Sequence, residues 1–116
     1  MKLRLTRQAD ADLAAIARDT IRLFGVNQAL RYRDIIKEGL AMLSREPDRP
    51  ATQDRSELGL NIRSFHLQHA AHRRSGAAHI VYFVMDAEKE EIVVLRVLHE
   101  AMEPKRRLTS ALALKE

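Results

Sequence analysis

The side chains of this chain that could do chemistry are mostly histidines and arginines. Three histidines recur at every third position, His66, His69 and His72, and neutral imidazole is a common zinc ligand. The flanking apolar residues favour a strand here, and residues three apart on a strand face opposite sides. We therefore expect no metal site and no cofactor, but a solvated basic strand edge that also includes Arg73 and Arg74.

His99 is the one candidate general base, because it stands where an apolar run, Ile92 to Leu98, comes to an end. The alternative interpretation is that its ring hydrogen-bonds the backbone at the end of the strand and orients the segment that follows. That segment carries the triplet Lys105, Arg106 and Arg107, which could contact DNA, an acidic protein or only solvent. The whole stretch is typical of a rigid strand that presents a recognition surface.

Composition limits the classes of protein to consider. The 116 residues are 46% hydrophobic and 31% charged, which is typical of a globular domain. There is no cysteine for a disulfide, and no run reaches the roughly 20 apolar residues of a membrane span. The N-terminus lacks an apolar signal core, so we expect a cytoplasmic protein with no membrane partner. The net charge of +4 favours acidic partners. We predict one domain over residues 1–108 and a tail over 109–116.

The first half of the chain predicts a strand and two helices. Lys2 to Leu5 alternates charged and apolar residues, as a strand does. Apolar residues then recur at helical spacing from Arg7 to Phe24, with Thr6 as the N-cap. Gly25 ends this helix, and a second helix runs from its cap, Asn27, to about Arg45. The short connection predicts an antiparallel helical hairpin.

The second half predicts three strands. Pro47 to Glu57 has no periodicity and is expected to be a loop. Leu60 to Leu67 resembles a strand, and its irregular alternation predicts a bulge or a twist. His79 to Met85 and Ile92 to Leu98 are apolar on both faces, as central strands are. The fold class is therefore α+β, in the order β-α-α-β-β-β, with the helical hairpin packed on a small, mainly antiparallel sheet and a short C-terminal helix.

In its segments 6–16, 56–67 with 79–83, and 97–104, the sequence resembles the ParE branch of the RelE/ParE superfamily of type II toxins. The first is 6–16, whose Ala9-x-x-Asp12-Leu13-x-x-Ile16 is similar to the family's capped first helix. The second is the strand pair 56–67 and 79–83, with an aromatic residue in the later strand. The third and most specific is 97–104, which is similar to the ending V/I-L-H-x-x-M-D, although Glu103 stands where Asp is commoner.

The resemblance implies a toxin of a type II toxin–antitoxin system of the plasmid stabilization kind, which causes growth arrest. It implies inhibition of DNA gyrase without enzymatic chemistry, and neutralisation by an acidic, ParD-like antitoxin that folds on binding. The toxin–antitoxin complex would bind operator DNA through the antitoxin. The target-binding residues would then be His99, Glu100, Met102, Lys105, Arg106 and Arg107. Met102 is also expected to pack against the sheet.

The two helices carry more apolar residues than a hairpin needs, and this excess predicts a groove for an amphipathic antitoxin helix. The residues expected to bind the antitoxin are Ile21, Leu30, Ile35, Met42, Arg63, Arg73 and Arg74.

A ribosome-dependent mRNA endoribonuclease of the RelE type is the alternative. That chemistry takes a base, cations and an acid, and resemblance to that branch offers His99, Arg96, Arg63 and Arg73. Arg96, among apolar neighbours, is equally expected to be a surface or ion-paired residue. No tyrosine follows Tyr82, and this absence together with the 97–104 ending favours the gyrase inhibitor. A third possibility is an inactive relative that only binds its antitoxin.

Overall fold

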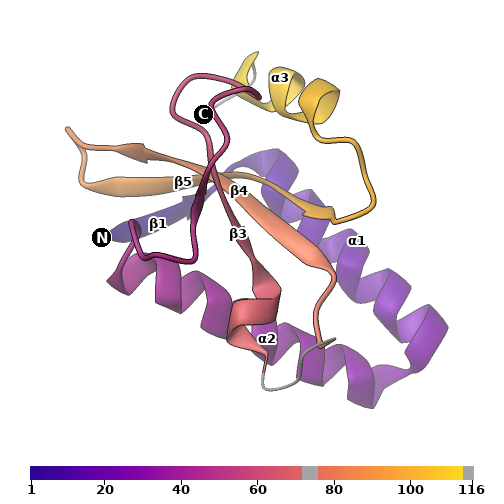
Figure 1. The fold of residues 1–116 in the computed structure, drawn as a ribbon. Helices are drawn as coiled ribbons and strands as arrows, with labels where there is room; N and C mark the ends of the chain where they lie inside the picture. Colours follow the sequence, from indigo (N-terminus) through magenta and orange to yellow (C-terminus); the bar gives the residue numbers. More distant parts are fainter. Residues whose placement is uncertain (72–75, 114–116) are drawn as a thin grey trace.

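The computed structural model describes residues 1–71 and 76–113 and confirms the α+β class. Two long helices come first, a five-stranded sheet follows, and a short helix ends the described chain (Figure 1). The helices are α1 (Arg7–Phe24), α2 (Val26–Arg45), the 3-10 helix η1 (Leu67–Ala70) and α3 (Lys105–Ala113). The strands are β1 (Lys2–Leu5), β2 (Gln53–Asp54), β3 (Arg63–His66), β4 (His79–Asp86) and β5 (Glu91–His99). Within the described residues, no helix is both long and apolar enough to span a membrane.

The sheet has the order β1-β5-β4-β3-β2. β1 runs parallel to β5, while the other neighbours are antiparallel. Tyr82 lies opposite Arg96 whereas Phe83 lies opposite Val94, so Leu95 is an extra residue in β5. This is the β-bulge of the sheet, and it changes the direction of the side chains that follow it.

Three predicted details were wrong. Of the bulge or twist predicted for the strand at Leu60 to Leu67, the bulge is wrong, because β3 pairs regularly with β4 from Arg63 to His66. This predicted strand is also shorter than expected, because Leu60 and Asn61 lie in a turn, with φ +61° at Asn61, and η1 begins at Leu67. The loop predicted between Pro47 and Glu57 contains β2, a strand of two residues, which is too short to show alternation.

The helical hairpin formed as predicted, but its connection differs. Thr6 caps α1, since its Oγ1 accepts the Ala9 N–H at 3.1 Å. Asn27 is not a cap: α2 begins at Val26, and Gly25 alone joins the helices with φ +90°. Gly25 donates its N–H to Ile21 O and accepts the N–H of Ala29, which satisfies both helix ends without a side chain.

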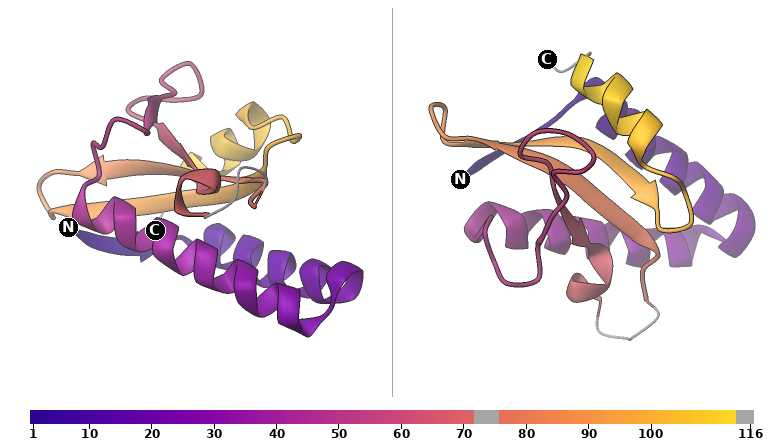
Figure 2. Two further views of the ribbon diagram at one scale, coloured as in Figure 1. Left: turned by 60° about the horizontal axis from the view of Figure 1, so that its bottom comes forward. Right: turned by 45° about the horizontal axis from the view of Figure 1, so that its top comes forward.

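Hydrophobic clusters lie on both faces of the sheet. The hairpin covers one face, over Phe65, Phe83 and Val94. The other face buries Tyr82, Leu95 and Leu98 beneath Leu58, Ile62 and Leu108. Figure 2 shows the hairpin and α3 on opposite sides of the sheet. Leu108 is fully buried, and burying one such side chain contributes roughly 1.5–3 kcal/mol, so it anchors α3 to the sheet.

Candidate functional site

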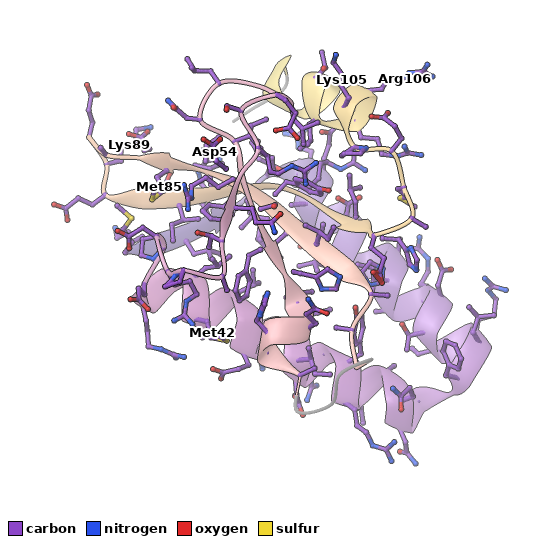
Figure 3. All side chains as sticks on the ribbon, viewed as in Figure 1. Met42, Asp54, Met85, Lys89, Lys105 and Arg106 are labelled. Atoms are coloured by element: carbon purple, nitrogen blue, oxygen red, sulfur yellow. The ribbon has the colours of Figure 1, made fainter. Side chains whose placement is uncertain are left out.

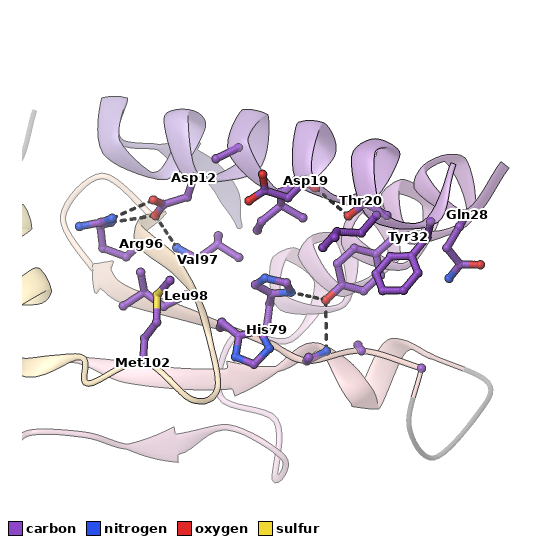
Figure 4. Close-up of a pocket in the computed structure, with 18 of the residues that line it drawn as sticks. Asp12, Asp19, Thr20, Gln28, Tyr32, His79, Arg96, Val97, Leu98 and Met102 are labelled. Carbon is purple, nitrogen blue, oxygen red and sulfur yellow. Dashed lines mark hydrogen bonds and ion pairs between the residues drawn. The ribbon is translucent and has the colours of Figure 1, made fainter. Parts of the chain in front are cut away.

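A cleft of about 650 Å³ lies between α1, the start of α2 and the adjoining ends of β4 and β5. Its outer part is apolar and exposed: Leu23 is 59%, Phe24 70% and Met102 45% exposed. Its inner part holds polar groups from α1, α2, β4 and β5 (Figure 4). An open apolar cleft with a few converging polar groups is the usual form of a binding site.

An ion pair lines the cleft where α1 crosses β5. The Asp12 carboxylate accepts from Arg96 Nε at 2.7 Å, from Arg96 Nη2 at 2.8 Å and from the Val97 N–H at 2.9 Å. The hydrogen bonds to Asp12 raise the pKa of the Arg96 guanidinium. Both side chains are largely buried: that of Arg96 is 18% exposed and that of Asp12 is 13% exposed. The bulge at Leu95 lies just before this pair, and Thr6 Oγ1 donates to the Leu95 carbonyl at 2.9 Å. Two residues of the first helical segment thus secure the irregular part of β5.

Tyr32, His79 and His99 form the inner wall of the cleft. Tyr32 Oη lies 2.5 Å from His79 Nδ1 and accepts the Ala78 N–H at 3.2 Å. The His79 and His99 rings meet edge to face, with centroids 5.4 Å apart and planes at 85°. Burial, followed by the neighbouring His99, lowers the pKa of His79 from 6.5 to about 4. Burial also raises the pKa of Tyr32. Both groups are therefore neutral near pH 7.

His99 has the backbone role that was one of its two interpretations. Its Nδ1 accepts the Ala101 N–H at 3.0 Å, and its carbonyl accepts the Met102 N–H at 2.9 Å. These bonds form the turn in which the chain leaves β5. The expectation that Met102 packs against the sheet was wrong, because Met102 lies exposed at the mouth of the cleft.

Of the residues proposed for nuclease chemistry, His99 and Arg96 line the cleft, but Arg96 is engaged in an ion pair. Arg63 donates to Thr52 Oγ1 and does not line the cleft. Arg96 is paired with Asp12, as its ion-paired interpretation anticipated. Arg73 falls outside the described residues. His99 therefore has neither Arg63 nor an uncommitted Arg96 for the charge stabilisation that phosphate cleavage requires.

The three evenly spaced histidines lie in different surroundings. His66 ends β3, with its Nε2 3.3 Å from Glu100 Oε2. His69 belongs to η1, not to the expected strand, and its ring packs against Phe65. His72 falls outside the described residues. Among those that are described, no three potential ligand residues come together as a metal site.

The segment after β5 is exposed but anchored. Glu100, Met102, Lys105, Arg106 and Arg107 are all exposed, and Lys105 and Arg106 project from α3 at the periphery of the molecule (Figure 3). α3 begins with three cations, which the helix dipole disfavours. Glu103 compensates, because its Oε1 accepts the Lys105 N–H at 2.6 Å and its carbonyl accepts from Arg107 at 2.8 Å.

The residues predicted to bind a partner helix are distributed over the hairpin. Ile21 and Leu30 are 46% and 44% exposed, whereas Ile35 and Met42 are partly buried against the core. Arg73 and Arg74 fall outside the described residues. A second, smaller groove of about 180 Å³ separates α1 from α2 and is lined by apolar side chains with Arg33 and Lys37.

Sequence reasoning did not select Asp12, Tyr32, His79 or Phe24 as site residues. Asp12 belongs to the motif 6–16, but its partner Arg96 is 84 residues away. The sequence contains one indication of a role for His79, because a histidine stands at the start of a strand that is apolar on both faces. Phe24 continues the apolar helical spacing, so the pattern wrongly placed it in the core.

Comparison with known proteins gives the same family that the sequence motifs resemble. A family model described as "ParE toxin of type II toxin-antitoxin system, parDE" matches residues 3–104. The fold is similar to a chromosomal ParDE toxin–antitoxin system from P. aeruginosa, with a TM-score of 0.64, 26% identity, and 85% of this chain and 95% of that chain covered. It is also similar to a RelBE toxin–antitoxin complex from Mycobacterium tuberculosis, with a TM-score of 0.52, 24% identity, and coverage of 84% and 95%. No curated protein matches the chain.

Proposed function

This chain belongs to the ParE toxin family of type II toxin–antitoxin systems, and from that premise we propose that it arrests growth by binding and inhibiting DNA gyrase. The inhibition involves no covalent chemistry. It is neutralised by an acidic, ParD-like antitoxin, and both proteins act in the bacterial cytoplasm, where the complex binds operator DNA through the antitoxin.

One observation carries the proposed mode of action. The segment from His99 to Arg107 is exposed, yet it is fixed at one end by β5 and at the other by the buried Leu108. An exposed segment held in this way loses little conformational freedom on binding, which favours a preorganised contact surface. Its cationic residues Lys105, Arg106 and Arg107 suit an acidic protein surface or DNA held by the target.

The hairpin supports the proposed antitoxin site. Exposed apolar side chains gather around its tip, and the two grooves beside α1 continue that surface. An amphipathic helix would bury this surface, and Arg33 and Lys37 at the edge of the smaller groove favour acidic residues on that helix. We place the antitoxin contacts at Ile21, Leu30, Ile35, Met42, Arg63, Arg73 and Arg74, with Leu23 and Phe24 added from their exposure.

A supercoiling assay with purified gyrase tests the proposed target. The wild-type chain should inhibit supercoiling, and a stoichiometric amount of the antitoxin encoded beside it should restore the activity. Replacing Lys105, Arg106 and Arg107 by alanine should weaken inhibition by about threefold to a hundredfold, given roughly 0.2–1 kcal/mol for each exposed charge contact. Lys105 and Arg106 line neither of the two grooves beside α1, so replacing these two alone should leave the antitoxin affinity within about twofold.

A matched variant controls for the change in net charge. Lys2, Arg45 and Lys89 are exposed and lie away from the segment, so replacing these three by alanine should leave inhibition unchanged. Equal weakening by both triple variants would show that only net charge matters. Expression in cells offers an independent test, because induction of the DNA damage response supports gyrase as the target, whereas cleaved mRNA with an intact chromosome contradicts it.

A further inference from the structure

Tyr32 joins the helical hairpin to the proposed target-binding segment through a short series of contacts. Its hydroxyl oxygen accepts the Ala78 N–H. We assign the donation of its single proton to His79 Nδ1, 2.5 Å away. A neutral His79 that accepts at Nδ1 carries its own proton at Nε2. The hydroxyl thus fixes both the backbone where β4 begins and the tautomer of the first side chain of that strand.

The contacts continue from β4 to the end of β5. His79 lies opposite His99 in the sheet, and the two rings pack edge to face. The orientation of the His99 ring matters for the backbone, because its Nδ1 holds the Ala101 N–H at 3.0 Å. Loss of the His79 orientation would therefore disturb the turn that leads away from β5.

A second connection runs in parallel through the backbone. The Ala78 carbonyl accepts the Glu100 N–H at 2.8 Å. The N–H of Ala78 in turn donates to the Tyr32 hydroxyl. The Glu100 carboxylate lies 3.3 Å from His66 Nε2 at the end of β3. The backbone of residues 99–102 is thus held in part by Ala78 and His99, the groups that Tyr32 and His79 contact.

We infer that Tyr32 and His79 are positioning residues that hold residues 99–102, and with them the proposed target-binding surface, in register with the hairpin. This inference rests on the proposed function only in naming which surface meets the target. Tyr32 is 8% exposed, and its hydroxyl is already bonded to Ala78 and His79, so we expect it to act through these two residues. The same contacts connect the surface proposed for the antitoxin to the one proposed for the target.

Amide hydrogen exchange by NMR on the full chain tests the inference. Tyr32→Phe keeps the ring and removes the hydroxyl. Exchange at Glu100 and Ala101 should become about tenfold faster, as expected for the loss of about one net hydrogen bond. Ile92→Val, a mild core change at the far end of β5, controls for a general loss of stability and should leave these two amides within twofold of wild type.

Gyrase inhibition and histidine spectra complete the test. Tyr32→Phe should weaken gyrase inhibition several-fold more than Ile92→Val does. Nitrogen-15 spectra should show His79 as the Nε2–H tautomer in the wild type and a mixture in Tyr32→Phe. Unchanged exchange at Glu100 and Ala101, or full inhibition by a variant in which they exchange faster, overturns the inference. If the wild type does not inhibit gyrase, the proposed function fails, while exchange and spectra still decide the role of Tyr32.

Discussion

Asp12→Ala should be among the most damaging single changes outside the apolar core. It removes an acceptor of three hydrogen bonds and leaves the Arg96 guanidinium and the Val97 N–H without their partner. Breaking a buried ion pair from one side costs about 3–5 kcal/mol. Because the two side chains keep 18% and 13% exposure, water can partly solvate the remaining groups. We therefore expect a loss of about 3 kcal/mol in the free energy of unfolding.

Urea denaturation, followed by circular dichroism, measures this loss. A small domain has a stability of roughly 5–15 kcal/mol, so the variant should still fold. Asp12→Asn keeps the shape and one acceptor oxygen, and should lose about half as much. Asp19→Ala is the matched control, because Asp19 lies on the same helix in an exposed pair with Arg22, 3.6 Å away. Such a pair contributes about 0–1 kcal/mol.

A double-mutant cycle identifies the origin of the effect. Arg96→Met removes the charge but keeps most of the apolar stem. If Asp12 acts mainly through Arg96, the double variant should lose less stability than the two single variants lose together. The difference should be at least about 1.5 kcal/mol. A loss below about 1 kcal/mol for Asp12→Ala, or simple additivity with Arg96→Met, would refute the reasoning.

Three further outcomes follow from single contacts. Thr6→Val removes both the cap of α1 and the bond to the bulge, and should lower the free energy of unfolding by about 1–2 kcal/mol in urea. Folding lowers the pKa of His79 from 6.5 to about 4. Between these two pH values, the His79 ring therefore binds a proton in the unfolded chain but not in the folded one. Stability should thus be complete above about pH 6.5 and decrease by about 1–2 kcal/mol toward pH 4, allowing for solvent screening; the thermal midpoint of His79→Gln should vary less with pH. A Cβ at Gly39 would overlap Leu67, so Gly39→Ala should lower the thermal midpoint, with a cost of about 1–3 kcal/mol.

Local signals in the sequence predicted most of the fold. Thr6 followed by an apolar helical pattern predicted α1 and its cap, and the two doubly apolar runs predicted β4 and β5. What the sequence missed depends on partners distant in the chain. The bulge at Leu95 arises where β5 pairs with β4 and meets Thr6, and neither neighbour is visible in the pattern of β5 itself.

The candidate site was predicted unevenly for the same reason. The segment 97–104 was recognised because its short signature is continuous. The connection of Tyr32 to His79 joins residues 47 apart, and each looks ordinary in its own element. An exposed residue such as Phe24 is misplaced because periodicity indicates a helical face, and the hairpin tip extends beyond the sheet that this face covers (Figure 1).

The pairing of β1 with β5 determines how late in synthesis the sheet can be completed. Residue 2 lies opposite residue 91, so β1 has no strand partner until β5 has left the ribosome. The hydrogen bonds of Thr6 and Asp12 to residues of β5 likewise cannot form before then. The hairpin can form from local contacts much earlier, whereas pairing across so long a loop is slow. The surface at 99–107, which follows β5, is therefore among the last parts of the chain to be put in place.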